Sequence, residues 1–191
     1  MSDPLDPTLI AFRPLREQDI PLVYRWRCLP HVRQWWRDEP YEAIAVKLTR
    51  RAHGDEPASS FLMLYGAAPI GYIHTYHVSD FPDYAARVGS DAENAAGVDL
   101  FIGDARYLHR GLGAPIIREF LRAVVFADST VDSCLIGPDP TNMAAIRAYA
   151  KSGFRYLKTI PGERPDESEY LMRLARAESD DPHLAAGPDR P

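Results

Sequence analysis

A carboxylate inside an apolar strand pattern is the first feature of this sequence that suggests chemistry. Asp99 lies in the run GVDLFIG (97–103). Successive strand residues point to opposite faces, so Asp99 is expected to share a face with Phe101. The other face, predicted to face the core, then carries Val98, Leu100 and Ile102. A charged carboxylate beside a protein interior is costly unless it is paired. A carboxylate in this position can hold an ammonium group and accept its proton. The alternative is a solvent-facing or ion-paired structural aspartate.

A glycine turn before a helical pattern is the second feature. The N-terminus of a helix exposes unpaired backbone N–H groups and the positive end of the helix dipole, so it binds anions. Gly111 and Gly113 lack the Cβ atoms that would hold a phosphate away, and His109 and Arg110 add positive charge. No Lys-Ser/Thr pair follows, and Ile116 fills the third glycine position of a dinucleotide fingerprint. Taken by itself, the turn is a plain tight turn into a helix or, alternatively, a phosphate site.

Seven strands and four helical segments are predicted to position these residues. Short apolar or alternating runs indicate strands, and apolar residues at helical spacing indicate helices. The predicted strands are 9–15, 60–66, 68–78, 97–103, 131–137, 154–160 and 168–175. The predicted helices are 16–28, 29–54 (interrupted at Pro30 and Pro40 and ended by Gly54), 111–128 and 141–153. This order predicts an α/β (α+β) domain with a mixed, mostly antiparallel central sheet flanked by helices.

The connection between the third and fourth strands is long. Residues 79–96 are polar, and long connections inside compact domains are usually functional or disordered. Residues 1–8 are expected to be a loose lead-in and residues 9–176 the folded domain. The polar, proline-containing residues 177–191 are expected to be a disordered tail.

Composition narrows the class of protein. The chain has 191 residues, 46% of them hydrophobic, and no apolar run reaches the roughly 18 residues of a membrane span. The N-terminus lacks the basic and apolar regions of a secretory signal, so a cytoplasmic location is expected, with Cys28 and Cys134 as free thiols. The net charge of −5 argues against nucleic acid or an anionic membrane as partner. Acidic residues gather between positions 80 and 104, either as an attractor for a polycation or as a solvated loop.

Two motifs in order resemble a known family. RGLG (110–113) before a long apolar helix looks like the pyrophosphate loop of the GCN5-related N-acetyltransferase (GNAT) superfamily. DPTNMAAIRAYAKSGF (139–154) resembles the second signature of that superfamily. The segments FRPLREQDIPLVYRWRCLPHVRQWW (12–36) and IGYIHTYHVSDFPDY (70–84) resemble its aminoglycoside 6′-N-acetyltransferase branch. The resemblance covers roughly residues 9–175 and implies a GNAT-type fold.

The resemblance implies acetyl-CoA as co-substrate. Backbone groups of the glycine turn would hold its pyrophosphate, Asn142 would contact the pantetheine arm or order the adjacent loop, and Tyr149 would protonate the leaving thiolate. Plain core packing is the alternative role for Tyr149. The expected cofactor-binding residues are Phe101, Ile102, His109, Arg110, Gly111, Leu112, Gly113, Ala114, Asn142, Ala145 and Tyr149.

The resemblance also implies an acceptor site around Asp99, which together with Tyr149 would be catalytic. Either Trp35 or Trp36 matches an aromatic residue of that site, and adjacent helical residues point about 100° apart, so both facing one ligand is not expected. The expected substrate-binding residues are Trp35, Trp36, Tyr72, Tyr76, Asp80, Asp83, Asp99 and Asp139. His74, His77 and His109 have no cysteine partner, so no metal is expected.

The chain departs from the family pattern at two positions. Leu108 stands where the pyrophosphate loop often begins with Gln or Arg. Gly137 stands where many aminoglycoside enzymes carry an acid, and Asp139 lies two residues further on.

The sequence thus predicts an enzyme that moves an acetyl group from acetyl-CoA to a primary amine of a cationic small molecule. An aminoglycoside 6′-amine, and so antibiotic resistance, is the favoured case, in a monomer or homodimer. The alternatives are an acyltransferase of siderophore biosynthesis, acting on a hydroxylated lysine or ornithine, and a non-catalytic acyl-CoA-binding module.

Overall fold

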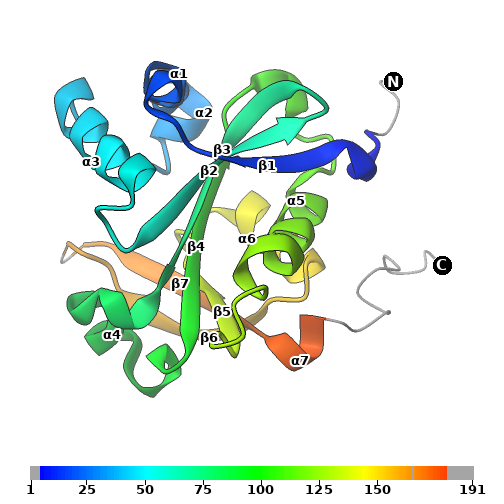
Figure 1. Cartoon of the computed structure of the whole chain (residues 1–191). Helices are drawn as coiled ribbons and strands as arrows, with labels where there is room; N and C mark the ends of the chain where they lie inside the picture. The colour runs from blue at the N-terminus through cyan, green and yellow to red at the C-terminus, as the bar shows by residue number, and fades with distance from the viewer. Residues whose placement is uncertain (1–4, 165, 180–191) are drawn as a thin grey trace. The chain divides into compact units, whose positions relative to one another are not determined.

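The computed structural model describes residues 5–164 and 166–179 (Figure 1). Its seven strands follow the hydrogen-bonded order β1-β2-β3-β4-β5-β7-β6. The chain divides into two compact units. The first unit comprises Met1–Tyr76 and Val98–Leu112, and the second comprises His77–Gly97 and Gly113–Pro191. Strand β4 (Ala95–Ile102) contributes its first residues to the second unit and its last residues to the first. Most of the expected tail, residues 180–191, lies outside the described residues.

Three antiparallel neighbours and three helices build most of the first unit. Strand β1 (Ile10–Pro14) pairs antiparallel with β2 (Ala58–Tyr65), and β2 pairs antiparallel with β3 (Ala68–His77). Helices α1 (Ile20–Arg27), α2 (Pro30–Arg33) and α3 (Tyr41–His53) pack against them (Figure 1). Their shared core consists of Leu15, Ile20, Val23, Trp26, Val32, Ile44, Leu48, Leu62, Tyr72 and Phe101.

Prolines mark the starts of these helices and one glycine ends the last of them, as the sequence predicts. Pro21 and Pro30 lie in the first turns of α1 and α2, where a missing N–H costs nothing. Pro40 precedes α3, and Gly54 ends it with a left-handed φ of 79°. The interrupted segment 29–54 is therefore two helices joined by a short non-helical stretch that includes Trp35 and Trp36.

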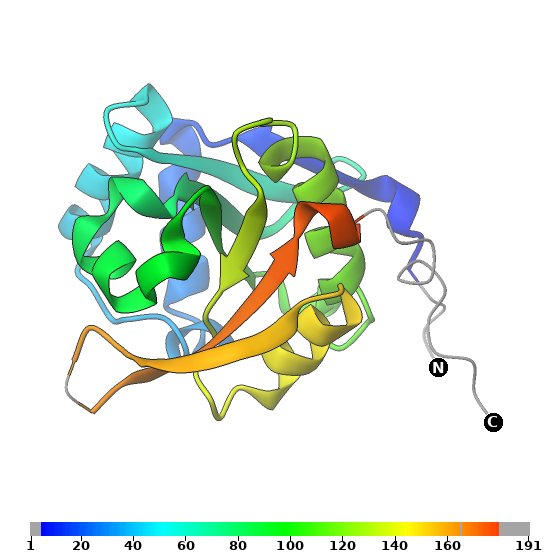
Figure 2. The ribbon, with the colours of Figure 1, turned by 90° about the horizontal axis from the view of Figure 1, so that it is seen from below.

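The second unit combines a short parallel pair with an antiparallel ribbon. Strand β4 pairs parallel with β5 (Ser133–Ile136) through three residue pairs, beginning with Ala95 and Ser133. Strand β7 (Ser168–Ala175) pairs antiparallel with both β5 and β6 (Arg155–Pro161). The connection from β4 to β5 runs through α5 (Gly113–Phe120) and a π-helical turn (Leu121–Val125). Helix α5 packs beside α6 (Met143–Lys151), and a short helix α7 (Arg176–Ser179) follows β7 (Figure 2).

The expectation that residues 79–96 form an irregular connection is wrong, because the segment is largely helical. It contains helix α4 (Pro82–Val88) between two 3-10 turns, Val78–Asp80 and Gly89–Ala92, and β4 begins at Ala95. Pro82 starts α4 and Gly89, at φ 74°, ends it, so short-range signals operate within a polar composition. Lys158 donates to the Val88 carbonyl (2.5 Å) and to Asp91 (2.6 Å), which ties the segment to β6.

The predicted core face of β4 also needs correction. Val98 is buried as expected, but Phe101 on the opposite face is buried too, whereas Leu100 and Ile102 are half-buried. Because helices α1 to α3 cover the face that carries Phe101 in the first unit, this face lies in the core together with the aromatic ring. Asp99 shares that covered face, and its side chain is 42% exposed.

A close approach of β3 to β4 depends on Gly71. A Cβ at this position would lie 2.3 Å from the backbone oxygen of Phe101 and 2.3 Å from the Cε of Met63. Backbone cannot move aside as a flexible side chain can, so only glycine fits between the strands here. The next residues of β3, Tyr72 and His74, are thereby held near the part of β4 that carries Asp99.

Replacing Gly71 by alanine should therefore destabilise the protein. We expect Gly71→Ala to lower the free energy of unfolding by about 1–3 kcal/mol, the usual range for overpacking. Urea unfolding followed by circular dichroism measures it. The control is Thr75→Ala on the same strand, whose side chain is only half-buried. A Gly71→Ala loss no larger than that of the control would contradict the close-packing argument.

Candidate active site

Asp99 and His74 form a pair on neighbouring strands of the first unit. The Nε2 atom of His74 lies 3.3 Å from Oδ2 of Asp99. The side chain of His74 is 8% exposed and that of Asp99 42%, so the pair spans from the interior to the surface. Burial lowers the pKa of His74 below its usual 6.5, and the hydrogen bond to Asp99 opposes this only in part. A neutral imidazole therefore stands beside a carboxylate that solvent and ligands can reach.

Aromatic rings surround this pair. Trp36 meets the rings of Phe101, Tyr72 and His74 edge-on, with centroid distances of 4.9, 6.3 and 6.3 Å. Tyr76 stacks on His74 at 5.8 Å. Trp35, by contrast, is 41% exposed and has no part in this cluster. Of the two adjacent tryptophans, Trp36 alone lies in this cluster, although both lie outside the helices and the helical spacing used to predict this does not apply.

Tyr72 is buried beneath the aromatic cluster and does not line its exposed surface. It is 2% exposed, and its hydroxyl lies 2.8 Å from Ser60 Oγ and accepts from Arg51 at 3.1 Å. Burial raises the pKa of Tyr72, and Arg51 counteracts part of the effect. Because the phenol is neutral and already hydrogen-bonded, the expected direct contact of Tyr72 with an acceptor needs correction: the residue packs under Trp36 and His74.

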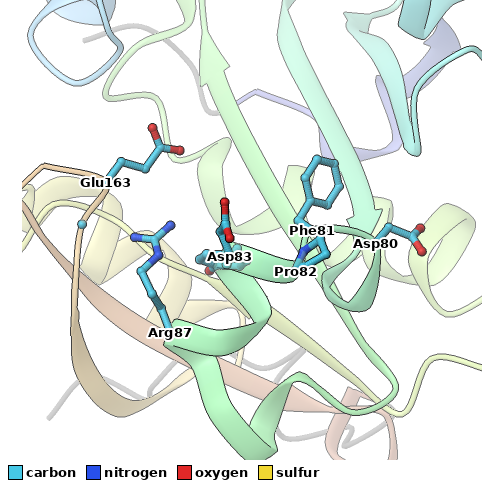
Figure 3. Close-up of a pocket in the computed structure, with 8 residues that line it drawn as sticks. Asp80, Phe81, Pro82, Asp83, Arg87 and Glu163 are labelled. Carbon is cyan, nitrogen blue, oxygen red and sulfur yellow. The ribbon is translucent and has the colours of Figure 1, made fainter.

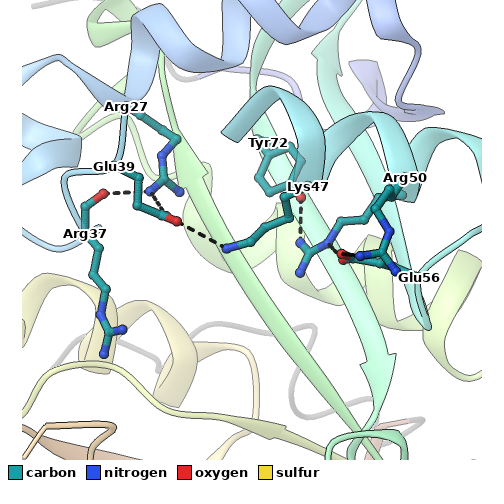
Figure 4. Close-up of polar contacts among 8 residues, drawn as sticks. Arg27, Arg37, Glu39, Lys47, Arg50, Glu56 and Tyr72 are labelled. Atoms are coloured by element: carbon teal, nitrogen blue, oxygen red, sulfur yellow. Dashed lines mark hydrogen bonds and ion pairs between the residues drawn. The ribbon is translucent and has the colours of Figure 1, made fainter. Parts of the chain in front are cut away.

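An ionic network that the sequence analysis missed holds the Trp36 segment in place (Figure 4). Arg27 donates to the Arg37 carbonyl (2.6 Å) and to Glu39 (2.8 Å), and its guanidinium lies 5.3 Å from the centre of the Trp36 ring. Lys47 reaches the other oxygen of Glu39 at 3.5 Å. Burial lowers the pKa of Arg27, while Glu39 raises it. No local motif signals the network, since its members come from α1, the 34–40 stretch and α3.

The predicted glycine turn is present and its two glycines have different roles. Gly111 has a φ of 79° and open space around its Cβ position, so its left-handed backbone conformation, not a close contact, favours glycine there. A Cβ on Gly113 would lie 3.1 Å from the Cβ of Ala148, so Gly113 permits close packing of α5 on α6. His109 also adopts a positive φ, 56°. Residues 109–112 belong to the first unit, whereas Gly113 and Ala114 belong to the second.

Other expected cofactor residues fall within elements that fix them. Phe101 buries its ring in the core, so a cofactor contact from this residue must come from its backbone. The carbonyl oxygen of Ile102 lies 3.2 Å from Nε2 of His31. Leu112 and Ala114 are buried.

Helix α6 of the second unit begins and ends as the second motif predicts. The side chain of Asn142 accepts from the Ala145 N–H at 3.1 Å and caps the helix. Asp139 accepts from the N–H (2.7 Å) and the hydroxyl (2.5 Å) of Thr141, so its carboxylate fixes the turn before the cap. Tyr149 is 9% exposed, and its ring centre lies 6.4 Å from that of Phe154.

Acidic residues of the second unit line a pocket of about 560 Å³ (Figure 3). Asp80 and Asp83 come from the start of the α4 segment, and Glu163 comes from the β6–β7 loop. Among the described residues that line the pocket, Arg87 is the one cation. Its guanidinium donates to the Pro161 carbonyl (2.8 Å) and to Glu169 (3.3 Å). Phe81 and Tyr84 also line the pocket, so acidic and aromatic residues occur together.

Gly137, where the chain departs from the family pattern, lies next to another acidic residue in the second unit. A Cβ on Gly137 would lie 2.6 Å from Oε2 of Glu169, which projects from β7. The volume in which an acid at position 137 would begin is thus occupied by another carboxylate. The sequence gives no hint of this exchange because the two residues are far apart in the chain.

Three further features concern metal ligands, membrane-spanning helices and cysteines. Within residues 5–164 and 166–179, no group of three or more His, Cys, Asp or Glu residues is placed to hold a metal ion. No helix among those residues is long and apolar enough to cross a membrane. Cys28 is exposed and Cys134 buried, and neither forms a disulfide.

The fold and the two motifs define a class of enzyme. A family model described as an acetyltransferase (GNAT) domain matches residues 16–161, most of the chain. The chain therefore belongs to the GNAT acetyltransferases, which confirms the family predicted from the motifs.

Within that class, several similar proteins are aminoglycoside acetyltransferases. The aminoglycoside N(6′)-acetyltransferase type 1 of Klebsiella pneumoniae is 25% identical over 173 residues, which cover 88% of this chain and 84% of that protein. A kanamycin resistance protein of Rhizobium radiobacter is 34% identical over 82 residues, 42% of this chain and 73% of its own. The crystal structure of aminoglycoside acetyltransferase AAC(6′)-Ib with coenzyme A superposes with a TM-score of 0.78 at 26% identity, covering 88% of this chain and 96% of that one. A structure of the same enzyme with coenzyme A and kanamycin has the same TM-score at 25% identity.

The Asn142 cap makes a prediction about stability. Asn142→Ala should lower the free energy of unfolding by about 1 kcal/mol, because the Ala145 N–H loses its acceptor. Asn142→Asp retains an acceptor and should cost less than half of that. Denaturant unfolding of both variants measures the difference, and equal losses would show that the cap contributes nothing.

Proposed function

We propose that this protein transfers the acetyl group of acetyl-CoA to a primary amine of an aminoglycoside, at the 6′ position. The observation that carries the proposal is the partly exposed Asp99 carboxylate in contact with a neutral His74, whose ring packs against Trp36 and Tyr76. An ammonium-bearing sugar suits this arrangement, because a carboxylate pairs with the charge and aromatic faces pack on the ring. The similarity to aminoglycoside 6′-acetyltransferases supports the same acceptor class.

Asp99 acts in this proposal as the base. It takes one proton from the acceptor ammonium, directly or through a water, and so frees the nitrogen lone pair for attack. Bound acetyl-CoA supplies the acyl carbon: the C–N bond forms and the thioester C–S bond breaks. The Tyr149 phenol donates a proton to the sulfur. The nitrogen loses one proton as the amide forms, so one proton is lost for each proton gained.

The glycine turn acts as the site for the pyrophosphate. Gly111 leaves its backbone open, and the positive φ values of His109 and Gly111 shape a turn with N–H groups available to anions. Asn142 orders the start of α6, which carries Tyr149. The acid-lined pocket of the second unit is assigned to attraction of the polycationic acceptor.

Asp99→Asn is the central test. With kanamycin as acceptor, we expect kcat/KM to fall about 10²- to 10⁴-fold, since the base is lost, while the Kd for acetyl-CoA changes less than about twofold. A thiol-release assay measures turnover, and calorimetry measures acetyl-CoA binding. The control Asp55→Asn removes the same charge from an exposed position and should be silent. Unchanged turnover in Asp99→Asn would rule out this role.

The acceptor panel for the same assay should include aminoglycosides, polyamines, peptide N-termini and hydroxylated lysine. Thiol release with aminoglycosides alone is the expected result. Release only with hydroxylated lysine and a longer acyl-CoA would replace the proposal by the siderophore-type reaction. Binding of acetyl-CoA without release from any acceptor would instead favour a non-catalytic module.

The acidic pocket makes a separate prediction. The double variant Asp80→Asn/Asp83→Asn should raise KM for kanamycin about 3- to 10-fold at low salt and leave kcat unchanged, because it weakens attraction and not chemistry. The difference should shrink at 0.5 M salt, roughly, where screening is strong. An effect on kcat alone, or no salt dependence, would contradict a role in attraction.

A further inference from the structure

His74 is a buried titratable side chain that the reaction steps above do not use. It lies on β3, with Nε2 3.3 Å from Oδ2 of Asp99, and the side chain is 8% exposed. Its other ring nitrogen, Nδ1, is buried and has no hydrogen-bond partner among the described residues. A buried polar atom without a partner is uncommon in proteins, so the contact of Nε2 with Asp99 is the polar interaction that can explain why the ring is held here.

The unpartnered Nδ1 fixes the protonation of the ring. An imidazolium carries a proton on both nitrogens, so it would bury an Nδ1–H donor with no acceptor. Burial independently disfavours the charged ring. Of the two neutral forms, the one with its proton on Nδ1 would again bury an unpaired donor and would turn a bare nitrogen toward a carboxylate. The form with its proton on Nε2 avoids both costs and donates to Asp99.

The charged groups on the elements packed against His74 also affect whether its ring is protonated. Arg51 and Lys47 on α3 disfavour a further positive charge, while Asp99 on β4 favours it. The titratable and aromatic groups that face the ring are Asp99, Arg51, Lys47, Tyr72, Tyr76 and Trp36.

We propose that neutral His74 is a positioning residue for Asp99: its Nε2–H holds Oδ2 and thereby directs Oδ1 toward the acceptor ammonium. The inference rests on the proposed function of Asp99. Because the ring donates its single proton and cannot take up another without burying an unpaired donor, the proton that leaves the ammonium goes to Asp99 and stays off His74. The Trp36, Tyr72 and Tyr76 rings fix the plane of the imidazole, so the carboxylate is held in one orientation.

Two substitutions of His74 separate positioning from packing. His74→Leu removes the donor and keeps the bulk, and His74→Gln restores an N–H donor of similar reach. We expect His74→Leu to lower kcat about 10- to 100-fold, with KM for kanamycin and Kd for acetyl-CoA within about twofold of the native values. His74→Gln should recover most of kcat. The control is His77→Gln, which alters an exposed His–carboxylate pair on the same strand (3.0 Å to Asp128) and should leave kcat unchanged.

The Asp99→Asn background distinguishes the possible failures. If His74 acts through Asp99, His74→Leu should lower the residual rate of Asp99→Asn by less than about twofold. A loss of 10-fold or more in that background would overturn the positioning role. If Asp99→Asn abolishes turnover but His74→Leu alone does not change kcat, this inference fails and the proposed function stands. If Asp99→Asn itself is fully active, the proposed function fails first.

Stability against pH tests the neutral state of the ring even where His74→Leu does not fold. The unfolded chain protonates His74 as pH falls through 6.5, whereas the folded chain does so only at a lower pH. The unfolded state therefore binds more protons in that window, and the free energy of unfolding falls as pH falls below about 6.5. Compared with the native protein, His74→Gln should lose up to about one proton of this linkage between roughly pH 6.5 and 5. An identical pH slope in His74→Gln would overturn the assignment of a neutral ring.

Discussion

The close approach of β3 to β4 is the constraint on which the candidate site depends. Gly71 lets the strands meet where a side chain would strike the Phe101 carbonyl. Three residues after Gly71 on β3 and two residues before Phe101 on β4, His74 and Asp99 lie 3.3 Å apart. His74 is buried, whereas the Asp99 side chain is 42% exposed. The strand geometry thus brings a buried imidazole against a carboxyl group that solvent still reaches.

The aromatic residues connect this pair to the rest of the first unit. Trp36 is packed by Phe101 and Tyr72 and covered by the Arg27 guanidinium, which is itself held by Glu39. Helices α1 and α3 therefore contribute to the site through charged side chains as well as through apolar burial. This explains why a non-helical stretch between Pro30 and Pro40 can present a tryptophan in a defined position.

Local signals made much of the fold predictable from the sequence. The strand around Asp99, the glycine turn and the helix from Asn142 to Tyr149 each depend on neighbours in the chain, and all were placed correctly. Helix α4 was missed because its polar composition hides a proline start and a glycine end. The core face of β4 was assigned to Leu100 because alternation alone cannot tell that helices cover the side of Phe101.

Contacts between distant segments explain what sequence reasoning missed at the site. His74 could be seen only as a lone histidine, since its closeness to Asp99 depends on the pairing of β3 with β4. The Arg27–Glu39–Lys47 network and the position of Glu163 in the acidic pocket likewise join residues with no common motif. Tyr72 was expected at the ligand surface, but the depth of a strand residue depends on what packs over it.

The position of Glu169 beside Gly137 couples three residues of the second unit. A Cβ at 137 would lie 2.6 Å from Oε2 of Glu169, the far end of a flexible side chain, so a larger residue at 137 requires Glu169 to rotate. Arg87 pairs with the other carboxylate oxygen of Glu169, so that rotation also disturbs this ion pair. A substitution at 137 therefore changes the charge arrangement at Arg87, which lines the acidic pocket.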